Sequence, residues 1–121
     1  MKTVFKAVYE VSENTYLSPC ICTPFNINVS ASKVDIGTLW NDKDIIGYYT
    51  GFKTLEEANH FAIANTLYTK NRFVNKILKL QVTDYHTFST VGKCFSLKNE
   101  GVLFEKAEKI LKVYKIKYNE E

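Results

Sequence analysis

A chain of 121 residues, 45% apolar and 24% charged, has the length and composition of one ordinary globular domain and excludes wholesale disorder. No apolar run approaches the roughly 18 to 20 residues of a membrane-spanning helix, and the first residues lack the apolar segment of a signal peptide. We therefore expect a single domain over residues 1–121 that is cytoplasmic and has no membrane partner.

The net charge of +3 comes from 15 lysines and a single arginine, Arg72, against 13 acidic residues. A DNA mimic would need a large acidic excess, and a protein dedicated to duplex DNA usually uses arginines for bidentate contacts. The charge total disfavours both classes, so we do not expect nucleic acid as a partner. A small anionic ligand held by a few lysines is compatible with it.

The three cysteines are Cys20, Cys22 and Cys94. An odd number without a secretion signal indicates reduced thiols. The C-x-C spacing is shorter than the spacing typical of zinc sites, and no second cysteine pair follows. We expect no metal and no cofactor.

In chain order, the first half predicts strands. Residues 3–11 alternate with period two, and a turn at 13–15 leads to a short return strand at Tyr16 and Leu17. Residues 18–32 are irregular around two prolines. Further strands are predicted at residues 33–40 and 45–52; the glycines of the latter permit bends or a close approach of another backbone.

A capped helix follows. Thr54 and Glu57 form a capping box, in which Thr54 accepts from the amide of Glu57 and Glu57 reaches back to the amide of Thr54. Leu55, Ala58 and Phe61 then recur at helical spacing. These residues predict an amphipathic helix over about 54–69.

The second half predicts a strand at 71–82, a polar loop at 84–91 and a closing strand at 112–118. Leu103, Ala107, Ile110 and Leu111 have helical spacing and predict a second helix over about 102–111. The fold class expected from this order is α+β, with a single, mostly antiparallel sheet and two helices.

No catalytic motif is present: the five glycines are scattered, and capping explains the pair Glu56 and Glu57. We therefore expect a protein that is not an enzyme. Aromatic residues next to polar and cationic ones, such as those near Tyr49 and Phe88, are what a nucleotide pocket needs, although most serve packing. Arg72 is either a phosphate clamp or a cation at the end of the first helix.

Four segments resemble a loose group of small phage and bacterial proteins. They are the opening strand from Val4, the segment from Gly51 through the capped helix, the strand 77–82, and the segment from Ala107 to Val113. Among such proteins, the chain resembles the Thoeris anti-defence sponges.

The resemblance implies a homo-oligomeric, non-catalytic protein that sequesters a cyclic ADP-ribose-type immune messenger in the bacterial host. The candidate ligand-binding residues for such a role are Arg72, Phe88 as a stacking face, Asn99 as a polar contact, Lys93, Lys109 and Tyr49. The alternative is a protein-binding inhibitor or adaptor of a bacterial defence enzyme, which would have no small-molecule ligand.

Overall fold

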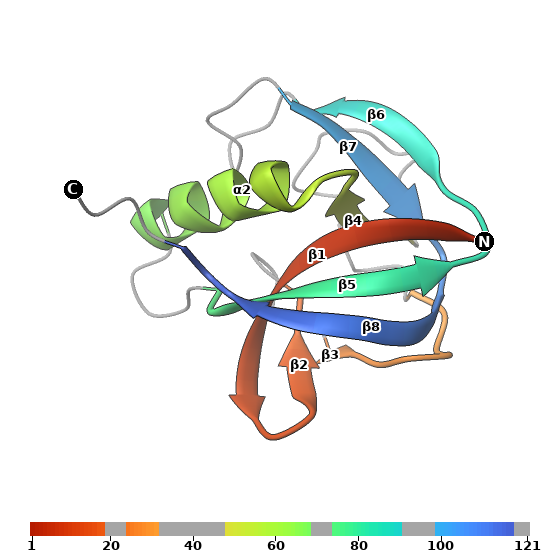
Figure 1. Ribbon diagram of the computed structural model, residues 1–121, viewed down its shortest axis with the longest axis horizontal. Helices are drawn as coiled ribbons and strands as arrows, with labels where there is room; N and C mark the ends of the chain where they lie inside the picture. Colours follow the sequence, from red (N-terminus) through yellow and green to blue (C-terminus); the bar gives the residue numbers. More distant parts are fainter. Residues whose placement is uncertain (19–23, 32–47, 69–73, 91–98, 118–121) are drawn as a thin grey trace.

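The structure is a computed structural model that describes residues 1–18, 24–31, 48–68, 74–90 and 99–117. Figure 1 shows the elements that these residues form. They are β1 (Lys2–Ser12), β2 (Thr15–Leu17), β3 (Pro24–Phe25), β4 (Tyr49–Phe52), α2 (Leu55–Tyr68), β5 (Lys76–Val82), β6 (His86–Thr90), β7 (Asn99–Phe104) and β8 (Ala107–Lys115).

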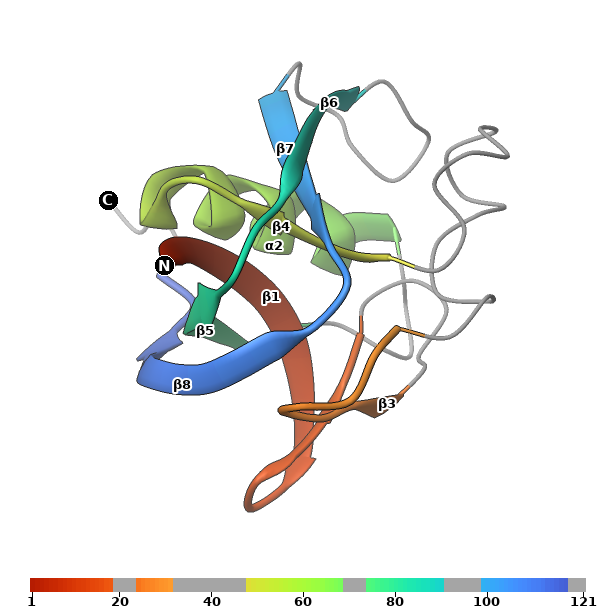
Figure 2. The ribbon, with the colours of Figure 1, turned by 90° about the vertical axis from the view of Figure 1, so that its right-hand side faces the viewer.

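The strands form one antiparallel sheet in which β1 is central. Its first half pairs with β5 on one side and contacts β4 on the other, and its second half pairs with β2. The order β6-β7-β4-β1-β5-β8 therefore runs through β1, and β2 with β3 extends from its far end. Figure 1 shows β1, β5 and β8 side by side, and Figure 2 shows how strongly the sheet curves.

The predicted opening strand, turn and return strand are confirmed. The turn between β1 and β2 contains Asn14 with φ 61°, a left-handed conformation that asparagine tolerates better than most residues. The register shifts between Glu10 and Ser12, so Val11 forms a bulge just before the turn. Strand β1 therefore bends away from the main sheet where it begins to pair with β2.

One face of the sheet, which we call the inner face, packs into the larger core. Residues that alternate along β1 and β5 are fully buried there and pack with aromatic residues of β3, β4 and β7: Val4, Val8, Leu78, Leu80, Val82, Phe25, Tyr49 and Phe104. Gly51 allows β4 to lie close to β1, because a Cβ atom would come within 3.1 Å of the Phe5 carbonyl oxygen. The expected close backbone approach is confirmed at this glycine.

Helix α2 packs on the opposite face, which we call the helix-side face. The predicted bond from the amide of Glu57 to Thr54 Oγ1 is confirmed, at 3.1 Å; the Glu57 carboxylate, predicted to accept from the Thr54 amide, accepts from the Thr54 hydroxyl instead, at 3.0 Å. Ala58, Phe61 and Ala62 pack on Ala7, Phe52, Val74 and Ile77. The helix therefore covers only the part of this face around Ala7 and Ile77.

The predicted helix over 102–111 is wrong, and with it the α+β fold with two helices. These residues form β7 and β8, and α2 is the one helix among the described residues. Strand β8 contains two bulges, because Glu108 and Leu111 have no partner in its pairing with β5. Each extra residue turns the strand period of two into a local spacing of three. This is why Ala107 and Ile110 share a face and suggested a helix.

Two other predictions differ from the structure or lie outside it. The segment 84–91, predicted as a loop, contains strand β6, which pairs with β7. The strand predicted at 33–40 lies outside the described residues. Within the described part of the chain, no helix has the length and apolar character needed to cross a membrane.

Candidate functional site

A groove lies between α2 and the end of β8. We call it the α2–β8 groove; its volume is about 840 Å³, and its lining combines apolar and cationic side chains: Leu55, Glu56, Asn59, His60, Ile63, Tyr114, Lys115 and Lys117. The volume lies in the range of roughly 300–1,000 Å³ that is typical of ligand pockets.

Asn59 fixes the open end of the groove. Its Nδ2 donates to the carbonyl oxygen of Lys117 at 2.7 Å, and the amide of Lys117 donates to Asn59 Oδ1 at 2.8 Å. A side-chain amide that donates to the backbone carbonyl of a residue and accepts from its backbone amide reproduces the pair of hydrogen bonds between two strands. It holds the segment after β8 against the exposed side of α2.

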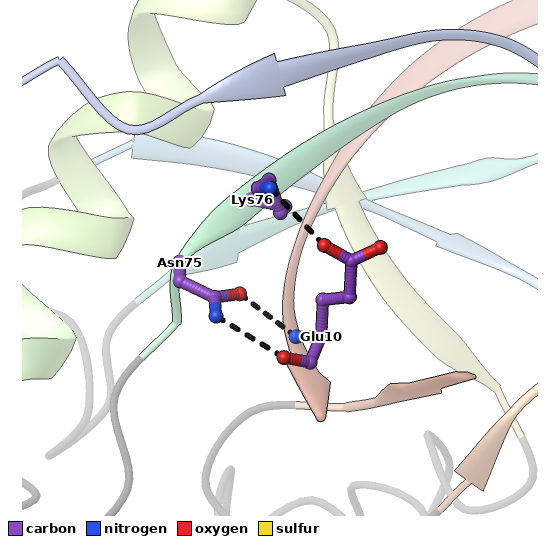
Figure 3. Close-up of polar contacts among 3 residues, drawn as sticks. All are labelled: Glu10, Asn75 and Lys76. Carbon is purple, nitrogen blue, oxygen red and sulfur yellow. Dashed lines mark hydrogen bonds and ion pairs between the residues drawn. The ribbon is translucent and has the colours of Figure 1, made fainter. Parts of the chain in front are cut away.

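The same arrangement occurs at Asn75, immediately before the start of β5. Asn75 Oδ1 accepts from the amide of Glu10 at 2.7 Å, and Asn75 Nδ2 donates to the Glu10 carbonyl at 3.2 Å (Figure 3). The Glu10 carboxylate pairs with Lys76 Nζ at 3.0 Å. This second clasp secures β1 to the start of β5, whereas the Asn59 clasp shapes the groove.

Tyr114 provides the aromatic surface of the groove. It lies opposite Ile77 in the β5–β8 ladder, and its ring is 6.2 Å from that of Phe5 at an angle of 48°. Lys112 Nζ lies 4.9 Å from the Tyr114 ring centroid. An exposed cation–π contact is worth about 0.5–1 kcal/mol, so a ligand ring that stacks on Tyr114 can displace this lysine.

Lysines at and beside the groove outnumber its one lining carboxylate, Glu56. Among the described residues, neither Lys112, Lys115 nor Lys117 forms an ion pair. Residues 106–117 contain five lysines and one glutamate, a net charge of +4, which exceeds the +3 of the whole chain. The positive charge is therefore concentrated in β8 and its ends, which creates a local potential that attracts anions.

A smaller cavity of about 280 Å³ lies between β6 and the start of β8, lined by Tyr48, Thr83, Asp84, His86, Leu103, Phe104, Glu105, Lys106 and Glu108. Thr83 Oγ1 donates to Glu108 Oε2 at 2.8 Å, while the buried Oε1 of Glu108 has no partner among the described residues.

The hydrogen bond from Lys2 to Asp84, 2.8 Å long, lowers the pKa of the Asp84 carboxyl group. In the described part of the chain, no group of histidine, cysteine and acidic side chains could hold a metal ion.

The structure does not gather the predicted site residues into one place. Arg72 and Lys93 lie outside the described residues. Phe88 and Asn99 lie on the paired strands β6 and β7, at the opposite end of the strand order from β8, which carries Lys109.

Tyr49 lies on the inner face and is only 2% exposed. Its hydroxyl donates to the Val29 carbonyl at 3.1 Å, and its ring packs edge to face on Phe25. Lys109 is exposed on the other side of the sheet. The two residues therefore cannot face a common ligand within one chain.

The residues of the α2–β8 groove are not among the predicted site residues. The relevant signal is the alternation of lysine with tyrosine and isoleucine in residues 112–118, which by itself predicts only a closing strand. His60 is exposed and also lines the groove. Comparison of the chain with protein-family models, curated proteins and solved structures gave no match.

Proposed function

We propose that the protein is a non-catalytic binding protein that holds a small anionic ligand with an aromatic ring, of the nucleotide class, in the α2–β8 groove. The observation that carries this proposal is the combination of a half-buried tyrosine with lysines that form no ion pair within the described residues, around one cavity of about 840 Å³. Aromatic stacking and cationic contacts are the two interactions that nucleotides use most.

In this proposal, the side chains of the groove make different contacts with the ligand. Tyr114 stacks on the base, with Leu55 and Ile63 on the helix providing apolar contacts. Lys115 and Lys117 contact the phosphate as point charges. The amide of Asn59 is already engaged with the backbone of Lys117, so it positions that residue rather than the ligand.

The resemblance to anti-defence sponges narrows the ligand to a cyclic ADP-ribose-type messenger and the role to sequestration. Sequestration requires tight binding without turnover, so the ligand must be recovered unchanged. A homo-oligomer remains part of this proposal.

The first test measures thermal stability and binding heat with AMP, ADP and cyclic ADP-ribose. A ligand at 100 times its dissociation constant stabilises the folded state by about 2.7 kcal/mol. We expect Tyr114→Leu, which keeps apolar volume but removes the ring, to weaken binding at least tenfold. Mass spectrometry after heat release should recover the intact ligand.

Tyr85→Leu is the matched control. Tyr85 is also half-buried and also has a lysine over its ring, with Lys2 Nζ 4.8 Å from the centroid, but it lies outside the groove. Equal losses in the two variants, or no stabilisation by any of the three nucleotides, would overturn the proposal. A chemically altered ligand would instead indicate an enzyme.

A further inference from the structure

The bulges of β8 gather lysines on the helix-side face, next to the groove. Lys109 and Lys112 are three residues apart, so a regular strand would place them on opposite faces. The extra residue at Leu111 changes this: Lys109 lies opposite Gln81, and Lys112 lies opposite Lys79, one alternate position further along the same face. Tyr114 is the next residue on that face.

Lys79 and Lys112 form a like-charged pair directly opposite each other in the ladder. Such pairs destabilise a sheet unless a counter-charge is near. The neighbouring pair of Lys76 and Lys115 has one, because the Glu10 carboxylate lies 3.0 Å from Lys76 Nζ. Within the described residues, no carboxylate pairs with Lys79, Lys109 or Lys112, which leaves a row of positive charge without its counter-charge.

The shape of this row indicates an extended anion. Successive positions on one face of a strand are about 6.6 to 6.8 Å apart, so Lys109, Lys112 and Tyr114 follow one another along β8, and Lys79 adds its charge beside Lys112 on β5. Lys109 and Lys112 are exposed, and Lys79 is half-buried beside them. The line leads directly to the Tyr114 ring and, through it, into the α2–β8 groove.

We propose that the helix-side face binds single-stranded nucleic acid without sequence preference. Its phosphates follow β8 from Lys109 to Lys112, with Lys79 contacting the strand from β5 opposite Lys112, and one base stacks on Tyr114. A positively charged track combined with an aromatic stacking surface is the usual basis of such binding. This inference rests on the proposed function, since the groove that accepts a nucleotide base is the end point of the track.

The total charge of the chain disfavours nucleic-acid binding, but the local charge of this face favours it. The chain as a whole carries only +3, but residues 106–117 alone carry +4. Single strands do not require the bidentate base contacts for which arginine is favoured in duplex recognition. A lysine track is sufficient for contacts to phosphates.

The test measures fluorescence anisotropy of labelled thymidine oligonucleotides of one, three and six residues at several salt concentrations. We expect the six-residue strand to bind at least tenfold more tightly than the mononucleotide. With three phosphates contacted, the slope of log K against log salt should be about −2, and Lys79→Gln and Lys112→Gln should each reduce its size by about 0.7.

Lys106→Gln is the control. The substitution removes the same charge from an exposed side chain, but Lys106 lies before the start of β8. If Lys79→Gln and Lys112→Gln behave like Lys106→Gln, or if duplex DNA binds as tightly as the single strand, the inference is overturned. All three lysines are on the surface or half-buried, and a thermal melt checks that each variant remains folded.

The outcomes separate this inference from the function on which it rests. Mononucleotide binding that depends on Tyr114, without a gain from a longer strand, would overturn the nucleic-acid inference and leave the nucleotide groove intact. Strand binding that depends on the lysines but not on Tyr114 would overturn the role of the groove and the stacked base.

Discussion

Lysines lie over aromatic rings on both faces of the sheet, but in opposite surroundings. On the inner face, Lys6 is 1% exposed; its Nζ donates to the Thr50 carbonyl at 3.1 Å and lies 5.5 Å from the ring centroids of both Phe25 and Tyr49. On the helix-side face, Lys112 is exposed and lies over Tyr114 alone.

The comparison shows how the same pair of residue types serves two purposes. A buried ammonium group is costly to desolvate, so Lys6 is fixed by the groups around it and belongs to the core. Lys112 keeps its water, and its contact with the ring is weak enough to be exchanged for a ligand. The inner face therefore provides stability, and the helix-side face remains available for binding.

The largest expected difference between the faces is in stability, and two neighbours on β5 test it. Leu80 is fully buried on the inner face, and Gln81 points to the helix-side face. We expect Leu80→Ala to lower the free energy of unfolding by about 2–5 kcal/mol, because it leaves a cavity in the core. Gln81→Ala should change it by less than about 0.5 kcal/mol. Urea unfolding measures both, and similar losses would mean that the faces do not differ.

Gly51→Ala tests how tightly the inner face is packed. The new Cβ would meet the Phe5 carbonyl oxygen at 3.1 Å and the Phe104 ring at 3.3 Å. Because one of these is backbone within the sheet, it cannot move aside cheaply, and we expect a loss of about 1–3 kcal/mol. The same urea measurement applies, and an unchanged or raised stability would show that β1 and β4 can separate without cost.

Thr54→Ala tests the stability of helix α2, which packs on the helix-side face. The substitution removes the hydroxyl that caps the Glu57 amide, and caps of this kind contribute about 0.5–2 kcal/mol. The helix should lose stability while the inner face is unaffected. Circular dichroism melts should show this loss, whereas Thr54→Ser, which keeps the hydroxyl, should lose much less.

Asp84→Asn is expected to give the smallest effect, because Lys2 and Asp84 are at the surface, away from both cores. The lowered pKa of Asp84 in the folded state means that its carboxylate stabilises the fold above the unfolded pKa of about 3.9, and that this contribution is lost as the pH falls through the lower, folded pKa. The wild type should therefore exceed the variant in stability at pH 7, and the two should converge in acid. A constant difference across a pH series of melts would contradict this assignment.

Local signals in the sequence were sufficient for the elements that depend on neighbours in the chain. The capping box at Thr54 predicted the start of α2, and regular alternation predicted β1 and its return strand, because these features need contacts only a few residues apart. The prediction for the first part of β8 was wrong because two bulges place Ala107 and Ile110 on one face at a spacing of three, whereas the closing strand predicted at 112–118 is confirmed as far as Lys115.

The candidate site could not be found in the same way. The α2–β8 groove joins residues 55–63 to residues 114–117, and only the pairing of β8 with β5 brings these segments together. Likewise, nothing near Lys112 in the chain indicates that Lys79 lies opposite. Which lysines share a face depends on register, and a bulge changes register without leaving a distinct pattern in the sequence.

Because of its two bulges, β8 is two residues longer than its pairing with β5 requires. Glu108 and Leu111 are surplus to the pairing with β5, so the loss of a residue at either position would leave every other side chain on its present face. The strand would, however, become straighter at its outer edge, where among the described residues only Asn28 donates to it, at the Ala107 carbonyl. A straight sheet edge is a better template for another strand than a bent one, so a shortened β8 would keep its core and its lysine track while losing protection against self-association.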